Sequence, residues 1–176
     1  VYGFWDGERT WKVRFAPNEV GRWFYSTSCY DPKNTGLHNQ AGTFICTAAT
    51  GRTRFDQHGP VGISRDGHYL AHENGTPFFW LADTAWNGAL LSKPEEWEFY
   101  IGERKRQKFT AVQWVSTQWR AAPQGDRDGD AAFTGQDQIA VNPRFFQKLD
   151  HKLDALNRAG LLGVPVLLWA NPGRTN

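Results

Sequence analysis

The chain has 176 residues, of which 20 are Lys or Arg and 18 are Asp or Glu, and its formal net charge is +2. So balanced a composition lacks the strongly basic character that attracts nucleic acids or anionic membranes, and we expect no nucleic-acid partner. No apolar run approaches the ~18 residues of a membrane-spanning helix, so we also expect no membrane span.

Tryptophan is unusually frequent, with 9 Trp and 15% aromatic residues in total. Most of these rings are expected in the core. A surplus of Trp is also typical of proteins that handle carbohydrates, because the apolar C–H face of a sugar ring packs on an aromatic plane. The chain contains no Met and opens with Val1 inside an expected strand. We therefore expect it to be a processed or excised piece of a longer protein.

Residues 1–58 show the period-two alternation of β-strands and predict a partial β-sandwich domain of the immunoglobulin or fibronectin kind. Apolar residues alternate with charged or polar ones in segments 11–15 and 22–26, and turn residues separate the two segments. We expect these segments to pair as a hairpin, with a further strand at 43–48. A seven-stranded sandwich needs ~100 residues, so this domain is expected to be incomplete. It could bind carbohydrate or simply brace the next domain.

The two cysteines, Cys29 and Cys46, lie in strand-like surroundings. A disulfide between neighbouring strands would suit an oxidising compartment, and two free buried thiols are an equal alternative. Their spacing fits no zinc-binding pattern.

Residues 59–176 change to an alternation of strands and helices, which predicts the first three βα units of a (β/α)8 barrel. A hairpin over 67–82, with Asn74-Gly75 at its turn, delivers the chain into a buried first strand at 78–82. Further parallel strands are expected at 110–115 and 164–169.

The two helices between these strands have clear boundary signals. Pro94, after a capping box of Ser92 and Glu95, predicts a helix over 93–107. Asn142-Pro143 predicts the start of a second helix, and Gly160 predicts its end.

Polar side chains and tryptophans gather at or just beyond the expected carboxyl ends of all three strands. This is the edge at which (β/α) barrels place their sites. Amides and Trp rings suit the recognition of hydroxyl groups and the stacking of sugar rings. Each Trp could also be a core residue, and the strand-end Asp could also hold a turn. We expect a substrate site made of Asp83, Trp86, Gln113, Trp114, Trp169 and Asn171.

A pair of catalytic carboxylates is not evident in the sequence. Glycoside hydrolysis usually requires two carboxylates that flank the scissile bond. No Glu follows Glu103, and Asp83 is the sole carboxylate expected at a strand end. We therefore treat the catalytic residues as unknown, expect them beyond Asn176, and assign Asp83 to positioning the substrate.

The loop that holds Asp126, Asp128 and Asp130 has the spacing of a calcium-binding loop, with Asp137 at the twelfth place. Ala131 stands where such a loop needs Gly, and no helix pair flanks the segment. We interpret it as a solvated acidic loop and expect neither a metal nor a cofactor.

Three stretches of this chain resemble the apiosidase-like glycoside hydrolases: FWDGERTWKVRFAPNEVGRWFYST, GTPFFWLADTAW and NPRFFQKLDHKLDALNRAGLLGVPVLLW. The resemblance implies a β-sandwich ahead of a TIM-type barrel, with Asp83 and Trp86 at the rim of the site. It also implies bacterial enzymes, secreted, periplasmic or at the cell surface, that act on side chains of plant cell-wall or related polysaccharides. The reference activity of the family is the release of apiose from pectin side chains.

The resemblance places the catalytic carboxylates on later barrel strands, so we expect these 176 residues to be inactive alone. A non-catalytic glycan-binding protein and a structural cell-surface protein of the same fold are the alternatives.

Overall fold

The computed structural model describes residues 1–167, which fall into two compact units. The first unit comprises residues 1–2 and 13–50, and the second comprises residues 3–12 and the chain from Gly51 onward. The expected division between residues 58 and 59 falls at the end of a short helix, α1 (Arg54–His58), inside the second unit.

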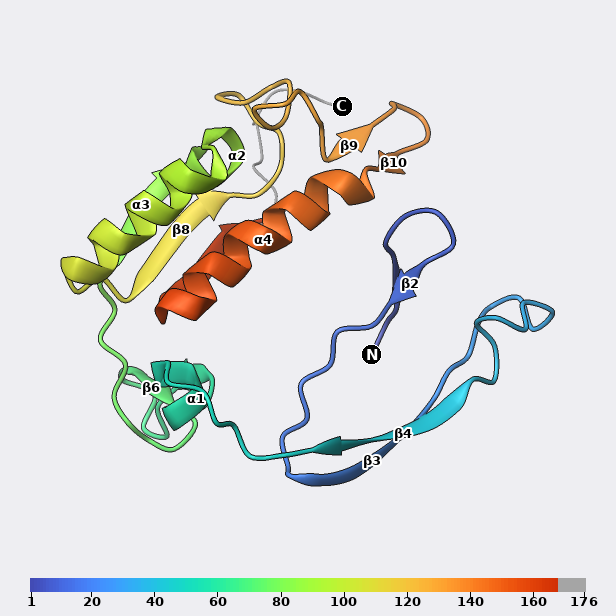
Figure 1. The fold of residues 1–176 in the computed structure, drawn as a ribbon, viewed down its shortest axis with the longest axis horizontal. Helices are drawn as coiled ribbons and strands as arrows, with labels where there is room; N and C mark the ends of the chain where they lie inside the picture. The colour runs from blue at the N-terminus through green and yellow to red at the C-terminus, as the bar shows by residue number, and fades with distance from the viewer. Residues whose placement is uncertain (168–176) are drawn as a thin grey trace. The chain divides into compact units, whose positions relative to one another are not determined.

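The first unit is built on one antiparallel pair of strands, β3 (Gly21–Ser26) and β4 (Ala41–Cys46) (Figure 1). Trp23 lies opposite Phe44 in the register, and their rings stack 6.4 Å apart. The expected strands near 22–26 and 43–48 are therefore present. Both cysteines are free thiols. A sandwich around this pair stays a prediction.

The expected hairpin between segments 11–15 and 22–26 is wrong. β2 (Trp11–Lys12) pairs instead with β1 (Phe4–Trp5) around the turn that begins at Asp6. The Asp6 carbonyl also accepts a hydrogen bond of 2.8 Å from the Gln147 side chain, which ties this small hairpin to the rest of the second unit, of which it is part. Alternation marks a strand but does not select its partner, because partner choice depends on contacts made elsewhere.

The chain enters the parallel sheet through two successive hairpins. β5 (Val61–Ile63) pairs with β6 (Leu70–His72), a pairing that the sequence did not predict. The expected turn at Asn74-Gly75 follows, closed by a 2.8 Å hydrogen bond from the His72 amide to the Thr76 carbonyl.

The parallel sheet has three strands in the order β11–β8–β7, with both pairings parallel. They are β7 (Ala82–Trp86), β8 (Ala111–Val115) and β11 (Leu162–Val166). β8 agrees with the prediction, β11 begins two residues before the expected strand, and the first strand lies four residues later than expected. Residues 168–169 of the expected third strand lie outside the described residues. The parallel sheet confirms the α/β class of this part.

Two long helices cover one face of this sheet, α3 (Pro94–Arg106) and α4 (Pro143–Ala159) (Figure 1). Both agree with the predicted helices, and Gly160 ends α4 in the left-handed conformation, with φ 78°. The cap of α3 lies one residue later than expected. The Lys93 amide donates to the Glu96 side chain, whereas the predicted capping box joined Ser92 and Glu95. A single-turn helix, α2 (Gly88–Leu91), lies between β7 and α3.

The main core lies between the sheet and these helices. The Trp97 ring, 1% exposed, donates a 3.0 Å hydrogen bond to the Lys152 carbonyl and so links α3 to α4. No helix in the described part of the chain combines the length and apolar character needed to cross a bilayer. The buried members of this core are Ala89, Trp97, Ile101, Val112, Trp114, Ala155, Leu156 and Leu161.

Candidate functional site at the carboxyl edge of the parallel sheet

The carboxyl end of β7 carries a locally irregular backbone. The parallel register with β8 shifts between Thr84 and Trp86, which marks a bulge. Trp86 has φ 47°, a left-handed conformation that is rare for a bulky side chain and costs about 1–3 kcal/mol. Such strain persists where the surrounding structure holds it, and it clusters at binding sites. Among the expected site residues that the structure describes, Trp86 alone has a left-handed backbone, and its side chain is 45% exposed.

The indole of Trp86 stacks on a second tryptophan from the next strand end. The ring centroids of Trp86 and Trp119 lie 5.6 Å apart with an interplanar angle of 22°. Trp119 follows β8 and packs partly against a second buried cluster that includes Ala122 and Phe145. The guanidinium of Arg120 lies 5.8 Å from the Trp119 ring centre. The edge therefore presents a two-ring aromatic surface.

Hydroxyl and amide side chains fix the chain that follows β8. The Ser116 hydroxyl donates to the Val166 carbonyl at 3.0 Å, which joins the ends of β8 and β11. The Gln118 amide donates to the Phe133 carbonyl at 2.6 Å and accepts from the Ala132 amide at 2.9 Å. Gln118 thus attaches the loop to a short hairpin formed by β9 (Phe133–Thr134) and β10 (Ala140–Val141).

A lysine lies among the three carboxylates of the acidic loop. Lys148 Nζ on α4 donates to Asp126 at 2.8 Å and to Asp128 and Asp130 at 2.6 Å each. The carboxylate oxygens lie within 4.8 Å of one another, a spacing that could also hold a metal ion. Burial alone would lower the pKa of Lys148, but the hydrogen bonds that its ammonium donates to the three carboxylates raise it. The loop is therefore ion-paired to α4, a contact that the sequence did not predict, while Asp128 stays 55% exposed to solvent as expected of a solvated loop.

Asp83 lies inside β7 rather than beyond its end, and it has two partners on α3. Its Oδ2 accepts a hydrogen bond of 2.7 Å from the Tyr100 hydroxyl and forms an ion pair with Arg104. Burial raises the pKa of Asp83, and the hydrogen bonds from Arg104 and Tyr100 outweigh it, so the net pKa lies below its usual range. Burial, together with the neighbouring Asp83, raises the pKa of Tyr100. The geometry makes Asp83 an anchor between strand and helix, and its role in positioning substrate stays a prediction.

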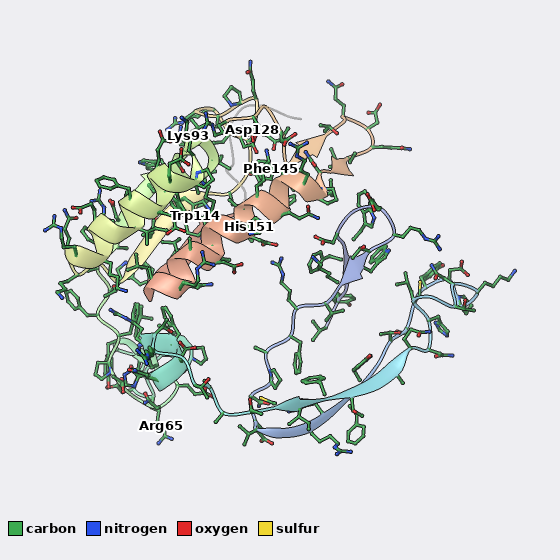
Figure 2. All side chains as sticks on the ribbon, in the orientation of Figure 1. Arg65, Lys93, Trp114, Asp128, Phe145 and His151 are labelled. Atoms are coloured by element: carbon green, nitrogen blue, oxygen red, sulfur yellow. The ribbon has the colours of Figure 1, made fainter. Side chains whose placement is uncertain are left out.

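Trp114 and Gln113 occupy opposite faces of β8. Trp114 is 1% exposed and packs edge-on against Trp97, 6.2 Å away, where the helices cover the sheet (Figure 2). That burial corrects our expectation for Trp114, because a ring enclosed by the core has no surface to offer a sugar. Successive side chains of a strand alternate between faces, so Gln113 faces away from the helices. Gln113 is half-buried and lies between Thr84 and Val164 in the register.

The remaining expected residues, Trp169 and Asn171, lie outside the described residues. The sequence reasoning did not select Arg104 or Lys148. Arg104 shares a helix face with Tyr100 at a spacing of four residues, a signal that could have pointed to a common partner. Nothing local in the sequence links Lys148 to the acidic loop.

The family comparison covers most of the chain. Residues 64–176 match the family described as "Apiosidase-like, catalytic domain", and residues 1–30 match a domain of unknown function, DUF5060. No curated protein matches.

Solved structures support the fold. A putative glycoside hydrolase from Bacteroides vulgatus is 22% identical, with a TM-score of 0.70 over 94% of this chain and 33% of that protein. A family 5 glycoside hydrolase from the same organism is also 22% identical, with a TM-score of 0.57 over 70% of this chain and 28% of that protein. A third structure, named as a glycoside hydrolase, is 24% identical, with a TM-score of 0.54 over 66% and 27%.

The chain therefore spans about a third or less of each of these solved proteins. At these identities the structural likeness concerns the fold, whereas the family match rests on the sequence of residues 64–176. This match covers well over half of the chain, including the parallel sheet and both long helices. The chain belongs to the apiosidase-like family of glycoside hydrolases.

Proposed function

We propose that this chain is the N-terminal part of a glycoside hydrolase that acts on side chains of plant cell-wall or related polysaccharides. The observation that carries the proposal is the match of residues 64–176 to the apiosidase-like catalytic domain. The aromatic surface at the carboxyl edge of the sheet supports it, because parallel α/β folds bind ligands at this edge. The partner is then an oligosaccharide or polysaccharide.

We propose that the whole protein contains a β-sandwich followed by a (β/α)8 barrel. The parallel sheet and its helices would form the first βα units of that barrel, whose usual length is ~250 residues. Trp86 and Gln113 would lie at the proximal sugar subsite, with Trp169 and Asn171 from the third strand end. An enzyme with this class of substrate would work in the periplasm, at the cell surface or in secreted form.

The catalytic pair of carboxylates is proposed to follow Asn176 in the whole protein. Asp83 is engaged by Arg104 and Tyr100, and the three acidic-loop carboxylates are engaged by Lys148. A general acid needs a raised pKa, whereas the pKa of Asp83 is held low. Residues 1–176 alone would then be inactive.

The test incubates the whole protein with pectic and other plant polysaccharides and measures hydrolysis as the release of sugars. We expect sugar release that stops when a Glu or Asp at a later strand end is replaced by its amide. Glycan binding without hydrolysis would favour the non-catalytic alternative. A protein that neither binds nor hydrolyses any polysaccharide of the panel would contradict the proposed function.

A further inference from the structure

The orientation of the Trp86 ring is set by its neighbours rather than by its own backbone preference. The residue sits at a bulge with φ 47°, a conformation that this side chain rarely adopts. A strained position of this kind requires contacts that hold it. The stacked indole of Trp119, 5.6 Å away and nearly parallel, provides such a contact while leaving Trp86 45% exposed.

The Trp119 ring is itself held in place by a buried cluster of side chains. The ring packs against the buried cluster of Leu90, Ala122, Ala132 and Phe145, so the cluster connects the ring to α2 and α4. The adjacent Gln118 is tied by both ends of its amide to the chain at Ala132 and Phe133. The acidic loop between these two points is held on α4 by Lys148. Trp119 is therefore a rigid support rather than a loosely attached surface ring.

We infer that Trp86 and Trp119 form a single sugar-stacking platform, in which Trp119 is a positioning residue that holds the exposed ring of Trp86 against a glycan. The inference rests on the proposed function and adds a specific residue to it. A sugar ring with an apolar C–H face is the class of ligand that such a platform takes, because a flat indole offers area without directional bonds. Preorganisation adds affinity, since a ring already held in place loses little freedom on binding.

The test compares variants of the whole protein in oligosaccharide affinity and in kcat and KM. Trp119→Ala should weaken affinity about five- to tenfold, mainly through KM, and Trp119→Phe should recover most of the loss. Trp80→Ala is the matched control. Trp80 is 47% exposed, close to the 45% of Trp86, but it precedes β7 at the opposite edge of the sheet. This control should keep the wild-type affinity.

A spectroscopic readout separates the platform from general folding. Two stacked indoles couple their electronic transitions, so the Trp86–Trp119 pair should contribute a paired band to the circular dichroism, seen as the same difference spectrum when Trp86→Phe or Trp119→Phe is subtracted from the wild type. The Trp97–Trp114 pair in the core, 6.2 Å apart, is unchanged in both variants and cancels from this difference. Sugar binding should perturb this band in the wild type. If Trp119→Ala removes the band yet binds oligosaccharide as tightly as the Trp80→Ala control, the inference is wrong. If the wild type shows the band but neither binds nor cleaves any glycan, the proposed function fails instead.

Discussion

The ion pair between Asp83 and Arg104 gives the most direct test of how β7 is attached to α3. The two side chains are 27% and 28% exposed, so neither is fully buried. A hydrogen bond to a charged group contributes about 1.5–3 kcal/mol when it is well shielded, and partial exposure reduces this. Replacing Arg104 with Met should therefore lower the free energy of unfolding of the whole protein by about 1–2 kcal/mol at neutral pH.

The sign of the pH dependence follows from the lowered pKa of Asp83. A carboxylate whose folded pKa lies below its unfolded value of ~3.9 stabilises the fold above that value. This contribution is lost as the pH falls through the folded pKa. The cost of Arg104→Met should therefore shrink between pH ~7 and pH ~3. A pH-independent remainder should persist, because the guanidinium also lies 4.8 Å from the Tyr100 ring centre and 5.5 Å from that of Phe109.

Urea unfolding at several pH values, with Asp83→Asn added to complete a double-mutant cycle, measures the coupling between the two groups. Arg106→Met is the matched control, because Arg106 forms an exposed ion pair with Glu103 on the same helix. That change should have little effect at any pH. A cost of Arg104→Met that is the same at pH ~7 and pH ~3, or a coupling near zero with Asp83→Asn, would refute the reasoning.

Three further changes probe other parts of the second unit. Lys148→Met leaves three close carboxylates without their cation and should lower the unfolding midpoint in neutral solution. Because the hydrogen bond from Lys148 lowers the pKa of Asp128, this loss should become smaller as the pH falls through that lowered pKa, and thermal unfolding across pH measures it. Trp114→Ala empties a site that is 1% exposed and should cost about 3–5 kcal/mol in urea unfolding, whereas a cost below about 1 kcal/mol would contradict its place in the core. Gly160→Ala places a Cβ on a residue with φ 78° and should lower the free energy of unfolding by about 1 kcal/mol in the same assay. Gly102→Ala, at an exposed position inside α3, is the control and should not lower it.

The helices of the second unit were predictable because their signals are local. Pro94 and Pro143 each open a helix, and Gly160 closes one in the left-handed conformation. Each signal acts within one turn of the residue that carries it, so no knowledge of the remaining fold is needed.

The first parallel strand was misplaced because its position depends on a distant partner. The apolar run from Phe78 to Leu81 resembles a buried strand, yet Phe79 is 74% exposed. The register is instead set by Ala82 lying opposite Ala111, and the Thr110 amide donates to the Leu81 carbonyl just before the pairing begins. Hydrophobicity alone does not show where such a ladder starts.

The same four-residue shift changes the candidate site. It moves Asp83 from the strand end into the strand, where Arg104 and Tyr100 reach it, and it leaves Trp86 at the edge. The identity of Trp86 as an exposed strand-end ring was predictable. The stacking of Trp86 on Trp119 was not predictable, because it depends on the path of the loop that Gln118 holds by its hydrogen bond to Phe133.

The lysine among the loop carboxylates has a consequence for how the second unit responds to its surroundings. A loop ordered by a dissolved ion is ordered only while the medium supplies that ion above its dissociation constant. Lys148 is attached to the same chain, so its local concentration near Asp126 and Asp130 is set by the geometry of α4 and is independent of dilution. Any dissolved cation must first displace this attached one. The acidic loop should therefore become ordered together with α4 itself, whether or not the medium supplies a dissolved cation.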